Sequence, residues 1–357
     1  MYKGVKFIMA YTTINKSTSY FNSKLYTGDG GTNNAQTGVG FRPDWIWFKR
    51  RSGSGNHFTA DVVRGTYADG YKLLVPNDQD AEADYTYIKS LDSDGFTLGS
   101  NNNNVNGNSE TYVAWNWLAG GSQGSSNTDG TINTTYTSVN TTSGLSICKW
   151  SGTGSAGTIG HGLGAVPKMI IAKRTSATRN WPVYHHNIGN DKKIYANDTQ
   201  GESSSTNWNS TTPTSSVFSI GSADDINGSG STYVAYVFAE KPGFSKFGKY
   251  IGNGSSDGTF VYTGFRPEFI LIKNYTNGTG DPSVIYDTKR VGYNPNNNVL
   301  EGANANAEAS SDRIDILSNG FKLRYNWTPI NKNGDTYVYM AFGQSLVGSN
   351  NIPCNAR

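Results

Sequence analysis

Carboxylates that could face one another are the side chains of this sequence best suited to catalysis. Two pairs occupy corresponding places along the chain: Asp61 with Glu82, and Asp287 with Glu308. Two facing carboxylates are sufficient for glycoside hydrolysis. An arginine follows each aspartate three residues later, however, and an ion pair that fixes a loop is the simpler interpretation. The sequence therefore favours a protein without catalytic residues, and a polysaccharide-degrading glycosidase is the alternative.

Metal ligands and nucleophiles are sparse. The histidines His185 and His186 are adjacent, and on a strand they would point to opposite faces, so they are not expected to hold one metal ion together. Cys148 and Cys354 lie far apart, which indicates reduced thiols. The acidic loop from Asp78 to Asp84 lacks the ligand spacing of a calcium loop. We expect neither a metal site nor a cofactor.

Carbohydrate binding suits the composition better, because sugars present apolar C–H faces together with many hydroxyl groups. Three tryptophans lie among polar residues of expected loops, and the asparagines before the second and third of them are candidates as well. The candidate sugar-binding residues are Trp181, Trp208, Trp327, Asn207 and Asn326. The alternative is that these rings close the ends of a folded unit.

Two motifs recur three times and indicate the elements that position these residues. The first is a proline followed by an apolar run and a lysine; it reads Pro43–Lys49, Pro167–Lys173 and Pro267–Lys273. The second begins Thr-Tyr-Val, at 111–113, 232–234 and 336–338. The proline and the tyrosine are separated by 69, 66 and 70 residues, so we infer an internal repeat.

The repeated motifs predict strands. The apolar run after each proline has no alternation, which is typical of a strand covered on both faces. The second motif places a large ring at every second residue in Trp115 and Trp117. We expect Trp45, Trp47, Trp115 and Trp117 to lie in a core or an interface. Asp61 and Asp287 lie at corresponding places, with His185 near the equivalent position of the second repeat.

The expected fold is all-β, with three tandem β-sandwich, jelly-roll-like repeats of roughly 95 residues. The proposed boundaries are 1–24 for an N-terminal arm, 25–121 for repeat 1, 122–143 for a Gly/Ser/Asn/Thr-rich linker, 144–243 for repeat 2, 244–349 for repeat 3 and 350–357 for a C-terminal tail. The linker resembles a flexible segment that includes one extra strand, near 131–139.

Composition narrows the possible partners. The 357 residues include 43 Gly and 45 aromatic residues, and 30 basic against 27 acidic residues leave a net charge of +3. Without a cluster of basic residues, nucleic acid is not an expected partner. No apolar stretch approaches the roughly 20 residues of a membrane span, and the first ten residues are too short for a secretory signal. We expect synthesis in a cytoplasm and no insertion into a membrane.

The repeated motifs, together with 9–14 (Met-Ala-Tyr-Thr-Thr-Ile), 160–164 (Gly-His-Gly-Leu-Gly) and the ending 350–357, resemble a group of tail-fibre-like proteins of marine tailed bacteriophages. The resemblance covers nearly the whole chain and is specific for the family, but the family has no settled activity that could be assigned to residues of this sequence. The resemblance implies a virion structural protein, a tail fibre or other surface appendage that contributes to host attachment. The expected partners are other virion proteins, further copies of the chain in a homo-oligomer such as a trimer, and host cell-surface polysaccharide. A capsid-decorating fibre without a receptor role is a further alternative.

Overall fold

The protein consists almost entirely of antiparallel strands. The computed structural model describes residues 12–67, 70–276, 280–290 and 294–346. Within these ranges the helical segments are η1 (Ser17–Ser19), α1 (Asp224–Asn227) and α2 (Thr328–Asn331). The expected all-β class is confirmed.

One order of four antiparallel strands occurs in three successive parts of the chain. We call residues 21–117 unit 1, residues 134–238 unit 2 and residues 245–344 unit 3. The strands, in their order across each sheet, are β1 (Phe21–Thr27), β10 (Thr111–Trp117), β3 (Trp45–Arg50) and β4 (Phe58–Asp61) in unit 1; β12 (Leu145–Ser151), β19 (Thr232–Phe238), β14 (Met169–Arg174) and β15 (Pro182–His185) in unit 2; and β20 (Ser245–Ile251), β27 (Thr336–Gln344), β22 (Arg266–Asn274) and β23 (Val284–Asp287) in unit 3.

Shorter strands complete each unit. Unit 1 adds β2 (Asn34–Thr37), β9 (Gly95–Leu98) and β8 (Ile88–Asp92) in one sheet, and β5 (Thr66–Tyr67), β6 (Gly70–Leu73) and β7 (Ala83–Tyr85) in another. Unit 2 adds the pair β13 (Gly157–Gly160) and β18 (Val217–Ile220), and extends its main sheet with β11 (Thr134–Asn140), β16 (Lys192–Tyr195) and β17 (Ser203–Ser204). Unit 3 continues with β24 (Asn296–Glu301), β25 (Ala309–Leu317), β26 (Gly320–Leu323) and β21 (Phe260–Tyr262).

Each four-stranded sheet is buried on both faces, as the unbroken apolar runs predict. On β27, Tyr337, Tyr339 and Ala341 belong to the core of unit 3 itself. The alternate residues Val338 and Met340 belong to a core shared with the other units. Because successive side chains of a strand point to opposite faces, one sheet serves both cores.

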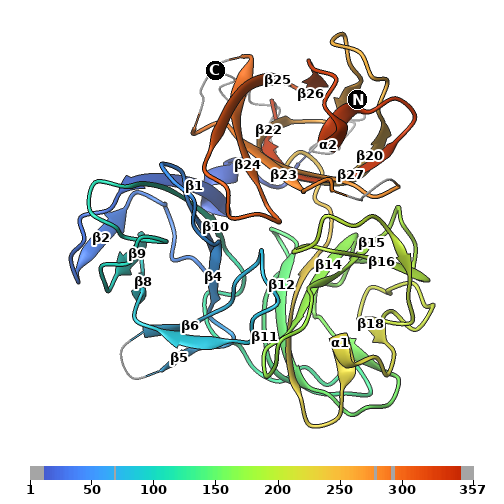
Figure 1. Cartoon of the computed structure of the whole chain (residues 1–357). Coiled ribbons are helices and arrows are strands. Elements are labelled where there is room, and N and C mark those ends of the chain that lie inside the picture. Colours follow the sequence, from blue (N-terminus) through green and yellow to red (C-terminus); the bar gives the residue numbers. More distant parts are fainter. Residues whose placement is uncertain (1–11, 68–69, 277–279, 291–293, 347–357) are drawn as a thin grey trace, which may run out of the picture.

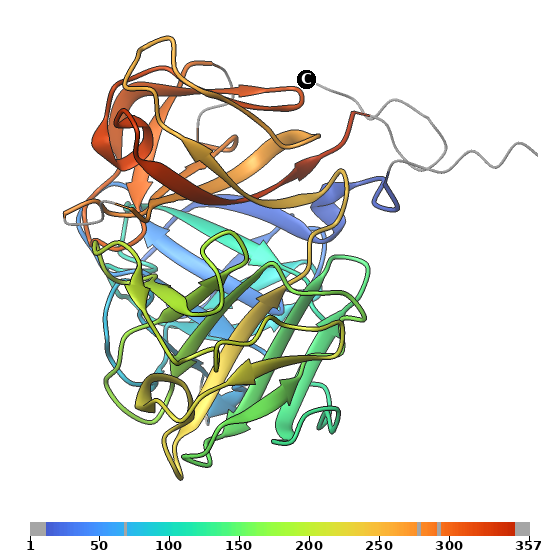
Figure 2. The same cartoon turned by 90° about the vertical axis from the view of Figure 1, so that its right-hand side faces the viewer.

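The three units surround a common centre (Figures 1 and 2). We call the shared apolar interior the central core. Within it, each pair of units is joined by at least one contact between aromatic rings. The ring centroids of Trp45 and Tyr236 are 4.4 Å apart and those of Trp117 and Phe269 are 5.6 Å apart, while Phe238 and Phe342 are separated by 6.0 Å. Trp45, Trp47, Trp115 and Trp117 are all buried, which confirms their expected place in a core or interface.

The two segments expected outside the repeats are integrated with them. Residues 122–143 include β11, which pairs with β12, so the expected linker contributes an edge strand to unit 2. Strand β1 begins at Phe21, within the expected arm 1–24. Just before it, Ser17 donates from its hydroxyl to Glu268 of unit 3 at 2.8 Å. Residues 1–11 and the tail 350–357 lie outside the described residues.

Candidate functional site

Buried hydrogen bonds to aspartate connect the closing strand of one unit with the fourth strand of another. Trp115 of unit 1 donates from Nε1 to Oδ2 of Asp287 in unit 3 at 3.0 Å. Tyr236 of unit 2 donates its hydroxyl to Oδ2 of Asp61 in unit 1 at 2.8 Å. Trp115 and Tyr236 have the same position on β10 and β19, opposite Trp47 and Ile171. The contacts therefore follow one pattern, from unit 1 to unit 3 and from unit 2 to unit 1.

Each of these aspartates also forms an ion pair with the arginine three residues later. The Arg64 Nε lies 2.5 Å from Asp61 Oδ2, and the Arg290 Nε lies 2.6 Å from Asp287 Oδ2; all four side chains are fully buried. Burial alone would lower the pKa of the Arg64 guanidinium, but the negative charge of Asp61 holds that pKa above its ordinary value. The ion pair fixes the loop that follows each aspartate, as the simpler interpretation of the sequence predicted.

The alternative catalytic pairing is geometrically unsuitable. The Arg64 guanidinium contacts both carboxylates, with Nε on Asp61 and Nη1 3.3 Å from Glu82 Oε2. Arg290 contacts Asp287 and Glu308 in the same way, with Nη1 3.0 Å from Glu308 Oε2. The Asp61 and Asp287 side chains have no exposed surface. A polysaccharide could not reach either aspartate, so these carboxylates stabilise the contacts between units.

At the boundary between units 2 and 3, the residues at these positions are different. His185 occupies in unit 2 the place of Asp61 and Asp287, because Met169 pairs with His185 as Trp45 pairs with Asp61. Its expected partner from unit 3 is Met340, which corresponds to Trp115 and Tyr236 and has no proton to donate. Burial lowers the pKa of His185 to about 3, so the ring is neutral. Its Nδ1 accepts from the Asn187 N–H at 3.3 Å, whereas its buried Nε2 has the Tyr339 carbonyl nearby but no well-aligned acceptor among the described residues.

Three buried lysines make the same kind of contact at all three boundaries between units. Lys49 donates to the Gly55 carbonyl of its own unit at 2.7 Å and to the Ala305 carbonyl of unit 3 at 3.0 Å. Lys173 and Lys273 make equivalent pairs of bonds. Lys173 reaches Arg179 O at 2.8 Å and Gln79 O of unit 1 at 2.9 Å, and Lys273 reaches Asp281 O and Asp198 O of unit 2, each at 2.9 Å. Desolvation lowers the pKa of each lysine to about 8.

Backbone hydrogen bonds also connect the three units with one another. The N–H groups of Glu82, Glu202 and Glu308 donate across unit boundaries to Thr175 O at 2.8 Å, Tyr275 O at 2.6 Å and Arg51 O at 3.0 Å, respectively. Sequence comparison matched Glu82 with Glu308 but missed Glu202, because no alanines flank Glu202. Unit 1 thus contacts unit 3, unit 3 contacts unit 2 and unit 2 contacts unit 1. This is the head-to-tail pattern of a closed three-membered ring.

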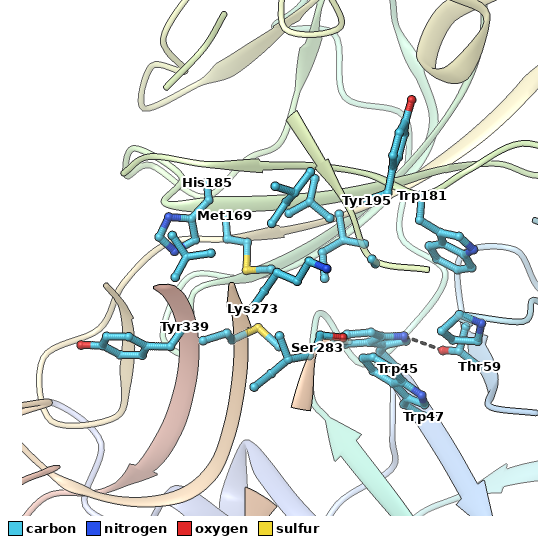
Figure 3. Close-up of a pocket in the computed structure, with 18 residues that line it drawn as sticks. Trp45, Trp47, Thr59, Met169, Trp181, His185, Tyr195, Lys273, Ser283 and Tyr339 are labelled. Carbon is cyan, nitrogen blue, oxygen red and sulfur yellow. Dashed lines mark hydrogen bonds between the residues drawn. The ribbon is translucent and has the colours of Figure 1, made fainter. Parts of the chain in front are cut away.

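A further position holds a different residue at each of the three boundaries, and at one boundary the residue is small enough to leave a cavity. Four residues before Asp61, His185 and Asp287 stand His57, Trp181 and Ser283. His57 Nε2 lies 3.0 Å from the Glu301 carbonyl of unit 3, and Trp181 Nε1 donates to the Asp78 carbonyl of unit 1 at 3.0 Å. Ser283 is too short to fill the corresponding space. A cavity there is bordered by all three units (Figure 3).

The candidate sugar-binding residues have separate locations. Trp181 and Trp208 are 2% and 1% exposed and Asn207 is 2% exposed, so none of them can present a surface to a sugar. Both rings are buried in the interior. Trp327 is partly buried, and the Arg313 guanidinium lies 3.4 Å from its ring centroid. Asn326, in the loop after β26, is exposed.

Exposed apolar side chains collect elsewhere, on unit 3. Strand β21 is the edge of its sheet, and its outward residues Phe260 and Tyr262 are 45% and 60% exposed. Phe260 pairs with Lys322 and Tyr262 with Gly320. A Cβ on Gly320 would clash with the Val261 carbonyl oxygen and lie 3.1 Å from the Phe260 ring, so only glycine fits here beside β21. We call Phe260, Tyr262 and Lys322 the β21 surface.

The comparison with protein families covers almost the whole molecule. Residues 16–345 match the model of a domain of unknown function, DUF7483. The chain belongs to this family. Because the match runs from the segment before β1 through all three units to the end of β27, the DUF7483 domain comprises the closed ring. No curated protein and no solved structure matches the chain.

The structure of this DUF7483 protein also bears on metal and membrane sites. Within the described residues, no three His, Cys, Asp or Glu side chains gather where they could hold a metal ion. Strand β15 ends at His185, so the prediction that His185 and His186 point to opposite faces is wrong: their rings stack with centroids 5.2 Å apart. None of the described helices is long and apolar enough to cross a membrane.

Proposed function

We propose that this DUF7483 protein is a structural protein of a bacteriophage virion, located in a tail fibre or other surface appendage, and that it contributes to attachment by binding host-surface polysaccharide. The β21 surface is the proposed contact with sugar. A flat exposed ring covers the apolar face of a sugar, while neighbouring charged groups bond with its hydroxyls. Lys322, beside Phe260, and its ion-pair partner Asp257, at 2.6 Å, supply such groups.

A difference between the edge strands of units 1 and 3 supports this proposal. On β2 of unit 1, Ala35 and Thr37 pair with Thr97 and Gly95, as Phe260 and Tyr262 pair with Lys322 and Gly320. The edge strand of unit 1 is therefore polar or small where that of unit 3 has two exposed rings. An exposed ring adds nothing to the core of its unit. Selection for a ligand explains this difference better than selection for folding does.

The loop after β26 extends the same end of unit 3. The amide Nδ2 of Asn331 donates to the carbonyls of Ser255, at 2.8 Å, and Tyr325, at 3.3 Å, so it ties together the loops that precede β21 and follow β26. Tyr325 is 51% exposed. Of the candidates from the sequence, Asn326 and the edge of Trp327 remain available to a bound glycan.

Binding to immobilised bacterial surface polysaccharides tests the receptor role. The double variant Phe260→Ala/Tyr262→Thr installs the residues of unit 1, and we expect it to bind at least tenfold more weakly than the wild type. Val166→Ala removes an exposed apolar side chain from unit 2 and is the matched control. Equal binding by the wild type and the double variant would refute the role of β21. If the wild-type protein binds no polysaccharide, the receptor role fails and a decorating fibre is favoured.

Mass spectrometry of purified particles tests the virion assignment, since absence of the chain from particles would contradict it. The proposal includes association with other virion proteins and with further copies of the chain. A homotrimer would need surfaces other than the inner sheet faces, because these faces already cover one another within a single chain. Sedimentation analysis gives the number of copies, and a monomer at all concentrations would remove self-association from the proposal.

A further inference from the structure

The cavity beside Ser283 is a place where the ring of three units lacks a side chain that the other boundaries have. Its equivalents are filled by His57 and Trp181, each bonded to a carbonyl of the next unit. Met340 also replaces the larger Trp115 and Tyr236. The cavity therefore originates in two substitutions that act at the same boundary, between units 3 and 2.

The lining is mainly apolar. Figure 3 shows His185 and Met169 on one side, Ser283 and Tyr339 on the other, and Trp45 and Trp47 at the end formed by unit 1. Ile171, Val183, Leu271 and Val338 add further aliphatic surface. Such a lining attracts an apolar molecule and gives water few hydrogen bonds.

One polar group of this lining lacks a well-aligned partner. His185 is 1% exposed, and its Nδ1 accepts a backbone N–H, so the proton of the neutral ring is on Nε2. The Tyr339 carbonyl offers the ring a weak hydrogen bond, which raises the pKa of His185, but among the described residues no acceptor is well aligned with Nε2. A buried donor with a poorly aligned acceptor is costly, and a ligand that supplies a better one removes that cost.

Lys273 is a second donor of the lining. Its ammonium group bonds to two carbonyls, those of Asp198 and Asp281. An ammonium has three protons to donate, so it retains the capacity for one more hydrogen bond. His185 and Lys273 therefore both favour an acceptor on the ligand.

The size of the cavity limits the ligand. The centre of a water molecule can occupy about 40 Å³ of it. Adding a water radius of ~1.4 Å on every side of a sphere of that volume gives roughly 180 Å³, close to the engineered cavity of about 150 Å³ that binds benzene. A compact molecule of about six to eight non-hydrogen atoms fits this space.

We propose that the cavity among Ser283, His185 and Met340 is a binding site for a small, mainly apolar molecule that carries one hydrogen-bond acceptor. The acceptor receives the Nε2 proton of His185, and the apolar part fills the space that Trp181 occupies at the next boundary. The site is buried in the centre of the ring, away from the β21 surface, and its occupation is independent of any glycan.

Ligand-observed NMR with the full chain tests the site with two probes, cyclohexanone, which has an apolar ring and one acceptor, and benzene, which has no such acceptor. The wild type is expected to transfer saturation to both probes. Ser283→Trp reproduces the residue of unit 2 and is expected to abolish both signals, whereas Ser215→Trp, at an exposed position, preserves them. His185→Phe is expected to weaken cyclohexanone binding by roughly three- to tenfold and to leave benzene binding unchanged.

Several results would overturn the proposal. Absence of binding of both probes to the wild type, or binding to Ser283→Trp equal to that of the wild type, would eliminate the site. Equal weakening of both probes in His185→Phe would eliminate the acceptor contact. If Ser283→Trp does not fold, Ser283→Leu is the filling variant, and the proposal then requires it to reduce the binding of both probes.

Discussion

The hydroxyl of Tyr236 in unit 2 and the carboxylate of Asp61 in unit 1 are joined by a buried hydrogen bond of 2.8 Å between residues 175 positions apart. A hydrogen bond to a charged group contributes about 1.5–3 kcal/mol to stability. Tyr236→Phe keeps the ring against Trp45 and removes this bond alone, so we expect the free energy of unfolding to fall by that amount. Urea unfolding measures it. Tyr262→Phe, at an exposed ring, is the control, and an equally small effect of both substitutions would show that the contact between units is weak.

The buried ion pair at Asp287 gives a larger expected effect. Asp287→Asn removes the charge beside Arg290 and weakens the acceptor of Trp115, and breaking a buried pair costs roughly 3–5 kcal/mol. Asp257→Asn breaks the pair with Lys322, but the Asp257 side chain is 85% exposed, and such pairs contribute about 0–1 kcal/mol. Thermal and urea unfolding of the two variants should rank them clearly. Similar losses in both would argue against a structural role for Asp287.

The lowered pKa values of the three buried lysines, Lys49, Lys173 and Lys273, make the stability of the protein depend on pH. The pKa of Lys49 is about 8 in the folded protein, below the value of about 10.4 expected for the unfolded chain. The unfolded state therefore binds more protons between these values, so the contribution of Lys49 to stability increases as pH rises from 8 to 10.

Lys49→Met tests this dependence by urea unfolding at pH 8 and pH 10. We expect the variant to lose roughly 2 kcal/mol of the increase between these two pH values relative to the wild type. Lys249→Met, at an exposed position, should retain the increase. The account of Lys49 is wrong if both variants follow the wild type.

The sequence predicts much of the fold because its motifs coincide with paired strands. The two repeated motifs form neighbouring strands in each unit, and the expected equivalence of Asp61, His185 and Asp287 appears in the register, opposite Trp45, Met169 and Phe269. Apolar periodicity indicates that a face is buried but not which surface covers it. The sequence therefore could not predict that the inner sheets cover one another around a common centre.

The site was harder to predict for the same reason. The lysine that ends each apolar run resembles the exposed end of a strand, yet its burial depends on a carbonyl of another unit, as with Lys49 and Ala305. Trp181 lies among polar residues in the sequence, but the Asp78 carbonyl of unit 1 accepts its indole proton. Phe260 and Tyr262 have the alternation of a half-buried strand, and only the place of β21 at the sheet edge exposes them.

Calorimetric unfolding of the full chain tests most directly the claim that the three units form one interdependent ring. The shared central core, the three lysine bridges and the buried aspartate contacts all connect different units. We therefore predict one cooperative transition, with a calorimetric enthalpy equal to the van't Hoff enthalpy. Two or three separate transitions would contradict the claim and would show that the units are independent tandem domains.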